Sequence, residues 1–209
     1  MTSAAEQLKS KGVVILNEFV PAFRCELILE ELEFAFWTPS TVVRQTQTGS
    51  VVTELSSGRV SESTGEEWFG PDLRRQVLQI EARLCRRLRL NRTHVEPWQA
   101  TRYRRGGKFE AHFDGGLFHD EPAGEREVTL LVYLNTLEAG GSTTFPNLGL
   151  DVSPRAGTVV AWRNLTADGT VDAQMKHAAR PVRKGRKVTL TTWSRQQPIR
   201  SSTRGRTRE

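Results

Sequence analysis

The stretch that decides the fold runs from Tyr103 to Asp114 and reads Tyr-Arg-Arg-Gly-Gly-Lys-Phe-Glu-Ala-His-Phe-Asp. It places His112 and Asp114 two positions apart on a predicted strand at about 108–113. Because side chains alternate between the two faces of a strand, the imidazole and the carboxylate point the same way. Two potential metal ligands therefore converge on one face. A His-x-Asp pair by itself is common on protein surfaces and indicates a metal site only weakly.

A third ligand and a cation strengthen this interpretation. His177 lies on a later predicted strand, and two histidines with one carboxylate form the facial triad that holds non-haem Fe(II) and leaves coordination positions open. Lys187 follows across a turn at 181–185 and returns on a neighbouring strand, near the metal. A buried ammonium needs an anion to offset its desolvation. A dicarboxylate that chelates iron at one end can supply that anion at the other.

The chain around this stretch alternates short Val, Thr, Leu and aromatic runs with Gly, Pro and Asn turns. These runs lie at about 95–103, 108–113, 127–135, 143–145, 157–162, 174–179 and 187–195. Many short strands at regular spacing predict a sandwich or jelly roll.

Upstream of these strands the pattern is mainly helical. We predict a strand at 13–19, a helix from Pro21 to Ala35, irregular strands with a mobile loop at 38–65, and a second helix from Pro71. The apolar face of the second helix carries Leu73, Val77, Ile80, Leu84 and Leu88. The fold class is therefore α+β, with a β core and N-terminal helices that pack against one sheet.

Length and composition set the organisation. A chain of 209 residues with 37% apolar and 26% charged residues is typical of one globular domain, which excludes disordered, collagen-like and disulfide-rich classes. We expect a single domain over 1–199, with helical support at about 8–90 and a β core at about 91–199. The final residues, 200–209, contain no apolar side chain and predict a disordered basic tail.

The expected cellular compartment depends on three features that the sequence does not show: a membrane-spanning run, a signal peptide and a disulfide framework. No apolar run approaches the ~20 residues that cross a bilayer, and none near the start suits a signal peptide. Cys25 and Cys85 lie in two separate predicted helices and suggest no disulfide framework, so we expect both thiols to be reduced and buried. These features predict a cytoplasmic protein with no membrane contact.

Several motifs together resemble one family. The stretch from Tyr103 to Asp114 resembles the Tyr-x3-Gly-x-aromatic-x-x-His-x-Asp signature of the prolyl 4-hydroxylases, which are Fe(II)- and 2-oxoglutarate-dependent oxygenases. Segments 128–135 and 140–146 resemble the central strands of that family, and 177–187, continuing to Trp193, resembles its second iron-ligand motif. The resemblance is close over about 96–195 and looser over the helical half.

The resemblance implies a fold and a ligand set. The fold is a double-stranded β-helix, or jelly roll, in which His112, Asp114 and His177 bind Fe(II). The far carboxylate of 2-oxoglutarate is held by Lys187, Tyr103 and Thr143. The implied chemistry couples oxidative decarboxylation of 2-oxoglutarate by O2 to hydroxylation of a C–H bond, with ascorbate as a reductant.

The resemblance also extends to the peptide side. Five positions match those that contact a peptide in the family, namely Arg59, Ser61, Glu96, Arg126 and Trp193. One position departs, because the family usually has a histidine two residues after the tryptophan and this chain has Arg195. The substrate implied is a prolyl peptide or protein, with its sequence preference left open. The loop at 115–126, rich in Gly and Pro, is expected to close over it.

Two other functions stay open at this point. The first is hydroxylation of a free amino acid or small metabolite by an enzyme of the same superfamily. The second, from another class, is a basic nucleic-acid-binding module, because the net charge is +6 and arginine dominates the cations. With 30 cations against 24 anions the surface is mixed in sign, which disfavours nucleic acid as a partner. The oligomeric state is not indicated.

Overall fold

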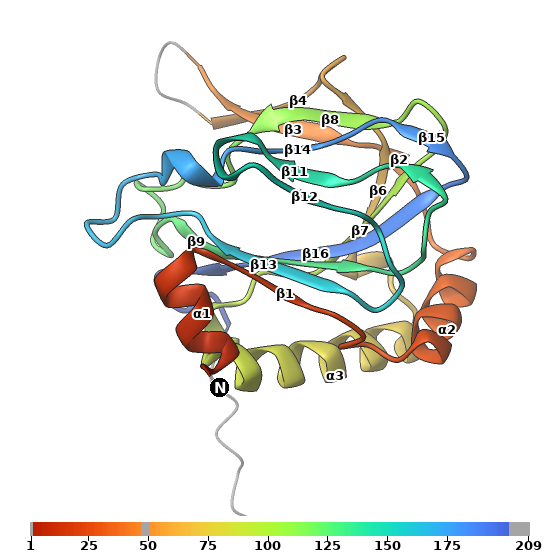
Figure 1. The fold of residues 1–209 in the computed structure, drawn as a ribbon, viewed down its shortest axis with the longest axis horizontal. Coiled ribbons are helices and arrows are strands. Elements are labelled where there is room, and N and C mark those ends of the chain that lie inside the picture. The colour runs from red at the N-terminus through yellow and green to blue at the C-terminus, as the bar shows by residue number, and fades with distance from the viewer. Residues whose placement is uncertain (1, 47–50, 201–209) are drawn as a thin grey trace, which may run out of the picture.

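The computed structural model describes residues 2–46 and 51–200. Figure 1 shows two facing layers of antiparallel strands, with the helices on the outer face of the larger layer. The helices are α1 (Ala4–Lys11), α2 (Ala22–Leu32) and α3 (Pro71–Leu88). Mixed helices and antiparallel sheets confirm the expected α+β class. No helix in the described part of the chain has the length and apolarity needed to cross a bilayer.

The larger sheet has seven strands. Their order across the sheet is β1 (Val13–Leu16), β13 (Val159–Arg163), β9 (Arg126–Tyr133), β16 (Lys187–Arg195), β7 (Gln99–Tyr103), β6 (Glu62–Gly65) and β2 (Thr38–Pro39). Strands from the first and last quarters of the chain therefore lie side by side in this sheet (Figure 1).

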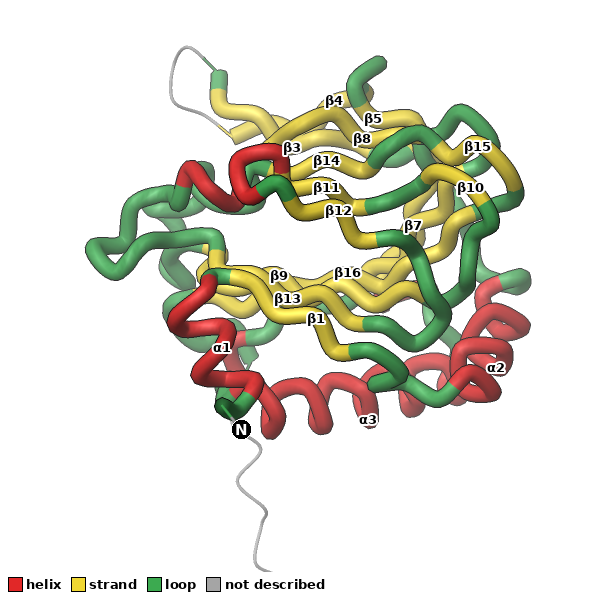
Figure 2. Tube along the Cα trace, in the orientation of Figure 1, coloured by secondary structure: helices red, strands yellow, loops and turns green. Residues whose placement is uncertain are grey.

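The smaller sheet faces it (Figure 2). Its order is β12 (Leu150–Val152), β11 (Thr143–Phe145), β14 (His177–Ala179), β8 (Lys108–His112) and β5 (Arg59–Val60). Two hairpin-like pairs complete the described strands: β3 (Thr41–Gln45) with β4 (Val51–Leu55), and β10 (Ala139–Gly140) with β15 (Val182–Lys184).

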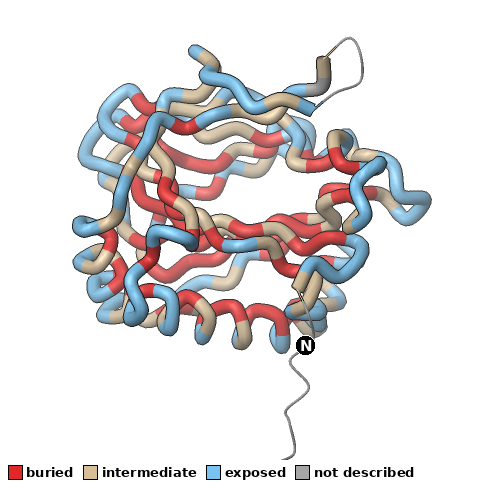
Figure 3. The backbone as a smooth tube through the Cα atoms, turned by 180° about the vertical axis from the view of Figure 1, so that it is seen from behind, coloured by how far each residue is buried: buried red, intermediate tan, exposed pale blue. Residues whose placement is uncertain are grey.

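Helices α2 and α3 begin where the sequence predicts, and α3 buries its predicted apolar face. Pro71 occupies the first turn of α3, where its missing N–H costs nothing. The apolar stripe of α3 from Leu73 to Leu88 is buried against the larger sheet. Both cysteines are free and buried, as expected. Figure 3 shows buried residues along the sheet and on the helix sides that face it.

Helix α1 is absent from the sequence prediction. Ser3 and Glu6 form a reciprocal capping box at its N-terminus, and Gly12 ends it in the left-handed conformation. The Ser-x-x-Glu spacing was the available signal.

Three expected segments differ in detail. Strand β8 ends at His112, so Asp114 lies in the following bend and not on the strand. Strand β7 begins only at Gln99, because Pro97 has no N–H to donate to a ladder. The strand expected at 174–179 starts at His177 and is preceded by a 3₁₀ turn over Ala173–Met175.

The segment at 38–65 contains β2 to β6, so the expected helical support includes strands that extend both sheets. Part of the loop expected there, 47–50, lies outside the described residues. The same holds for 201–209 of the expected tail. Arg200, at the start of that tail, bonds instead to the buried carboxylate of Glu81 and to the backbone oxygen of Glu96.

Side chains along β16 alternate between the hydrophobic core and a cavity between the sheets. Val188 and Leu190 face the helices and join the main core, while Lys187, Thr189, Thr191 and Trp193 line a cavity between the sheets. Strand β7 behaves the same way, because Ala100 enters the core and its neighbours line the cavity. The larger sheet therefore presents an apolar face to the helices and a functional face to the smaller sheet.

Candidate active site

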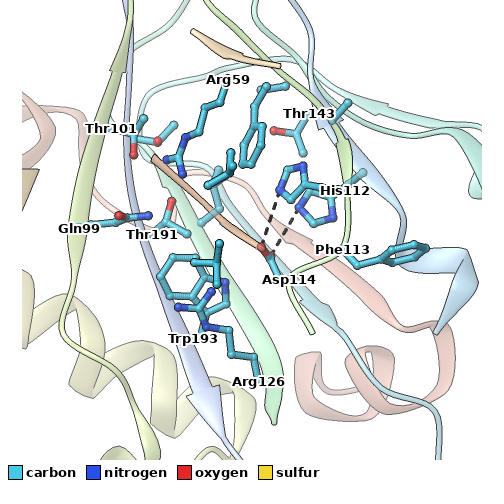
Figure 4. A pocket seen from close by; sticks show the side chains of 18 of the residues that line it. Arg59, Gln99, Thr101, His112, Phe113, Asp114, Arg126, Thr143, Thr191 and Trp193 are labelled. Carbon is cyan, nitrogen blue, oxygen red and sulfur yellow. Dashed lines mark ion pairs between the residues drawn. The ribbon is translucent and has the colours of Figure 1, made fainter. Parts of the chain in front are cut away.

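A cavity of about 330 Å³ lies between the two sheets. Figure 4 shows its labelled side chains, with Arg59 and Thr143 toward one end, Trp193 and Arg126 toward the other, and Asp114 between them. The cavity collects residues that are up to 152 positions apart in the sequence, from Thr41 to Trp193.

The three predicted iron ligands meet in this cavity. His112 and His177 are paired across strands β8 and β14, and Asp114 follows β8. Their ligand atoms all lie within 4.8 Å of one another. The Nε2 atoms of His112 and His177 are 3.8 Å and 3.5 Å from the carboxylate oxygens of Asp114, as the dashed lines of Figure 4 mark. The three groups can therefore hold one metal ion.

Both histidines direct Nε2 toward Asp114. Nδ1 of His112 lies 2.7 Å from the Glu110 carbonyl oxygen, and Nδ1 of His177 lies 2.9 Å from that of Met175. A carbonyl oxygen can only accept, so Nδ1 carries the proton in each ring. In the neutral ring Nε2 is then the nitrogen with the free lone pair, and it lies toward Asp114. Such backbone contacts fix the tautomer and the ring orientation of a metal-binding histidine.

The protonation states suit metal binding. Burial, together with the neighbouring His177, lowers the pKa of His112 to about 3, so its ring is neutral. Burial raises the pKa of Asp114, but the two histidines and Arg126 outweigh that effect and hold it below its usual value. Thr129 donates a hydrogen bond of 2.7 Å to the same carboxylate. Imidazole and ionised carboxylate ligands of this kind fit Fe(II).

Rings pack closely around the two histidines. Phe109 stacks on His112 with 3.6 Å between ring centroids, and Trp162 meets His177 edge-on at 4.7 Å. These contacts limit rotation of the imidazoles. Phe109, Trp162 and Thr129 were not among the predicted site residues, although Phe109 lies in the motif at 103–114 and Thr129 in the segment at 128–135.

Lys187 is the most unusual charge in the cavity. It is 1% exposed, and no acidic side chain among residues 2–46 and 51–200 pairs with it. Its Nζ lies 5.0 Å and 5.4 Å from the ring centroids of Tyr103 and Tyr133. Burial lowers the pKa of Lys187 to about 7. A buried ammonium without a protein anion is the arrangement that a bound dicarboxylate would complete.

Hydroxyl groups surround this lysine. Tyr103 is its partner across strands β7 and β16, and Thr143 lines the same cavity. The hydroxyl of Tyr133 donates a 2.6 Å hydrogen bond to Thr143 Oγ1, which orients the threonine hydroxyl. The three residues predicted to hold 2-oxoglutarate are thus brought together. Tyr133, which the sequence analysis did not single out, is an additional member of the group.

The five predicted peptide-side residues divide into two groups. Arg59, Arg126 and Trp193 line the cavity, whereas Ser61 and Glu96 do not. Glu96 accepts two 2.8 Å hydrogen bonds from Arg126, and the Ser61 hydroxyl accepts one of 3.3 Å from Arg59. The structure therefore places Ser61 and Glu96 behind the arginines, where they fix the guanidinium groups.

The loop after Asp114 is held against the cavity by a guanidinium group. Arg195 bonds to Glu121 at 2.6 Å, to Glu96 at 3.0 Å and to the Gly124 oxygen at 2.8 Å. The ring of Phe118 lies near two guanidinium groups, with Arg126 Cζ at 4.6 Å and Arg195 Cζ at 4.7 Å from its centroid. Arg195 does not line the cavity, so it acts on the loop that carries Phe118.

Comparison with known families agrees with this geometry. Residues 98–195 match the model of the 2OG-Fe(II) oxygenase superfamily. The match includes the predicted iron ligands, the three predicted 2-oxoglutarate contacts, Arg126 and Trp193. The chain is therefore similar to this superfamily and to its prolyl 4-hydroxylase members.

Its relatives by sequence are prolyl 4-hydroxylases. The chain is 35% identical over 158 residues to prolyl 4-hydroxylase subunit alpha-1 of Gallus gallus, covering 72% of this chain and 30% of that protein. It is 28% identical over 204 residues to prolyl 4-hydroxylase 13 of Arabidopsis thaliana, covering 88% of this chain and 71% of that protein. The chain thus spans less than a third of the length of the chicken subunit.

Solved structures share the fold. The viral collagen prolyl hydroxylase of Paramecium bursaria Chlorella virus-1, solved with 2OG, superposes with a TM-score of 0.66 at 21% identity, covering 90% of this chain and 97% of that one. A Trichoplax adhaerens prolyl hydroxylase, solved with a hypoxia inducible factor peptide fragment, gives 0.67 at 18% identity, covering 92% and 87%.

Proposed function

We propose that this chain is an Fe(II)- and 2-oxoglutarate-dependent hydroxylase of prolyl residues in peptides or proteins. One observation carries the proposal: a single cavity joins a His-Asp-His cluster, a buried unpaired lysine and an Arg126–Trp193 wall. When bound, Fe(II) and 2-oxoglutarate supply the oxidation, in which O2 is consumed, the cosubstrate loses CO2 to become succinate, and one oxygen atom enters a C–H bond.

The protein's own residues have three tasks in this reaction. His112, Asp114 and His177 would hold the metal, because two histidines and one carboxylate form a ligand set suited to Fe(II). Lys187, Tyr103 and Thr143 hold the far carboxylate, with charge-assisted hydrogen bonds worth roughly 1.5–3 kcal/mol each. Arg126 and Trp193 bind the peptide and orient one C–H bond toward the metal. No side chain acts as a nucleophile or a general base.

We also infer that the two facing sheets form a double-stranded β-helix. Consecutive core strands cross from one sheet to the other: β7 and β9 lie in the larger sheet and β8 in the smaller, and β13, β14 and β16 repeat the alternation. All the pairings in both sheets are antiparallel, which supports the same arrangement. The predicted use of ascorbate stays a prediction.

The test of the proposed function compares three potential substrates. The Fe(II)-loaded protein is incubated with 2-oxoglutarate and poly-proline, a collagen-like peptide or free proline, and the mass gain of one oxygen atom is measured. We expect the gain on peptides, dependent on 2-oxoglutarate and absent from a His177→Ala variant. Modification of free proline alone would replace the proposal with the small-metabolite alternative.

A further inference from the structure

A second cavity of about 350 Å³ shares a wall with the active-site cavity. Gln99, Arg126 and Trp193 line both cavities. The second cavity extends from this wall to Phe36, in the connection after α2, and to Trp68, at the end of the 3₁₀ turn Glu66–Trp68. Because Arg126 and Trp193 belong to the walls of both cavities, a peptide that contacts these side chains in the active-site cavity lies next to the second cavity.

The outer end of the second cavity is aromatic and exposed. Phe36 is 59% exposed and Trp68 57%, and their ring centroids lie 5.3 Å apart in a tilted pair. Large aromatic side chains that stay this exposed next to a cavity are typical of binding surfaces. Neither ring belongs to the buried hydrophobic clusters. Packing of the core therefore does not explain why the two rings lie together.

The walls contain polar atoms that lack partners. In the described part of the chain, the buried side-chain atoms without a hydrogen bond are Thr64 Oγ1, Trp162 Nε1 and Trp193 Nε1. Thr64 is 3% exposed and lines only the second cavity, and Trp193 lines both. A buried donor left unpaired costs about 1–3 kcal/mol, so a partner that reaches such a group, such as water or a ligand, offsets that cost.

We propose that this second cavity is an additional subsite for the peptide substrate, occupied by a proline-containing segment next to the residue in the active-site cavity. The inference rests on the proposed function. Proline rings pack well on aromatic faces, and an extended proline-rich chain offers carbonyl acceptors but few N–H donors. The cavity offers the complement, with the Phe36–Trp68 pair and the unpaired hydroxyl and indole N–H of Thr64 and Trp193.

The first test separates long from short substrates. Parent protein, the Phe36→Ala/Trp68→Ala variant and a Phe34→Ala control are assayed with a long poly-proline peptide and with a blocked peptide of three residues. Phe34 is 92% exposed and lies outside the cavity, which makes it a matched control. We expect the long-to-short ratio of kcat/KM to fall about tenfold in the double variant and to stay at the parent value in the control.

The second test uses Thr64→Val, which removes the hydroxyl and nearly conserves the volume. A role confined to packing predicts an unchanged or higher Tm and unchanged peptide affinity, because an unsatisfied polar group is lost. The subsite predicts that the same protein binds a fluorescently labelled long peptide severalfold more weakly by anisotropy.

These measurements keep the two proposals distinguishable. A parent that hydroxylates no prolyl peptide contradicts the proposed function. When the parent hydroxylates prolyl peptides, parent-like long-to-short ratios in the double variant overturn the subsite and leave the proposed function standing. Parent-like anisotropy in both variants overturns the subsite whether or not the parent turns over a peptide.

Discussion

The guanidinium carbon of Arg126 lies 3.6 Å from the ring centroid of Trp193. The same guanidinium makes two 2.8 Å hydrogen bonds to Glu96 and is 15% exposed. A largely desolvated cation–π contact of this kind is worth roughly 2 kcal/mol. The acid, the cation and the ring therefore act as one unit at the peptide end of the cavity, although they come from three separate segments.

Alanine at Arg126 or Trp193 is expected to raise the KM for peptide by roughly tenfold, because the peptide wall loses one of two mutually supporting side chains. Iron content and 2-oxoglutarate affinity should stay close to those of the parent. The double variant should lose less than the sum of the two single effects, since each residue positions the other. An unchanged peptide KM in both single variants would return these residues to a packing role.

Removal of any predicted iron ligand is expected to abolish turnover. Alanine at His112, Asp114 or His177 leaves two protein ligands, and bound iron, measured colorimetrically after desalting, should fall well below one per chain. Glu110→Ala is a suitable control, because only its backbone carbonyl contacts His112. A histidine variant with full 2-oxoglutarate-dependent activity contradicts the metal assignment.

Lys187→Ala is expected to weaken 2-oxoglutarate binding by about two to three orders of magnitude. Breaking a buried ion pair by removing one partner costs roughly 3–5 kcal/mol, and each 1.4 kcal/mol is about tenfold. Lys187→Arg should recover part of the loss, because it keeps the charge in a bulkier form. The measurement is an anaerobic titration of the Fe(II) protein with 2-oxoglutarate, followed by its charge-transfer absorbance. Parent-like affinity in Lys187→Ala would place the cosubstrate elsewhere.

Cosubstrate affinity should also depend on pH through Lys187. Burial lowers its pKa to about 7, and only the protonated ammonium pairs with a carboxylate. Affinity is therefore full below this pKa and falls as pH rises through it, by about tenfold per pH unit. Titrations between about pH 6.5 and 9 should show this slope. In Lys187→Arg the slope should disappear, because a guanidinium stays charged over this range.

Arg195 is expected to control the loop at 115–126 more than the peptide directly. Its side chain is 6% exposed and bonds to Glu121, which is 48% exposed, and to Glu96. Glu96 keeps its two hydrogen bonds from Arg126, so Arg195→Leu should destabilise the fold by roughly 1–3 kcal/mol in urea denaturation. Amide exchange at Phe118 should accelerate. Arg195→His should shift peptide preference while basal 2-oxoglutarate turnover persists. Parent-like amide exchange at Phe118 in Arg195→Leu would show that the contacts of Arg195 do not hold the loop.

Periodicity and local chemistry were readable in the sequence. The period of two along 187–193 places Lys187 and Trp193 on one face of a strand whatever surrounds that strand. The helix from Pro71 and the His-x-Asp spacing are equally local features, which depend on residues within one or two turns of backbone. These features predicted the α+β class and suggested a metal site. The full ligand set and the residues around Lys187 were predicted from the resemblance of several motifs to one family.

Only the tertiary structure shows which side chains from distant segments contact each other. Arg195 and Glu121 are 74 positions apart, Arg126 and Glu96 are 30 apart, and no periodic pattern specifies that either pair meets. The structure therefore decided that Glu96 and Ser61 lie behind the arginines and that Phe118 packs near two guanidiniums. It also decided that a second cavity adjoins the first. Local periodicity fixes which face a side chain occupies, but only the packing of distant segments determines what that face meets.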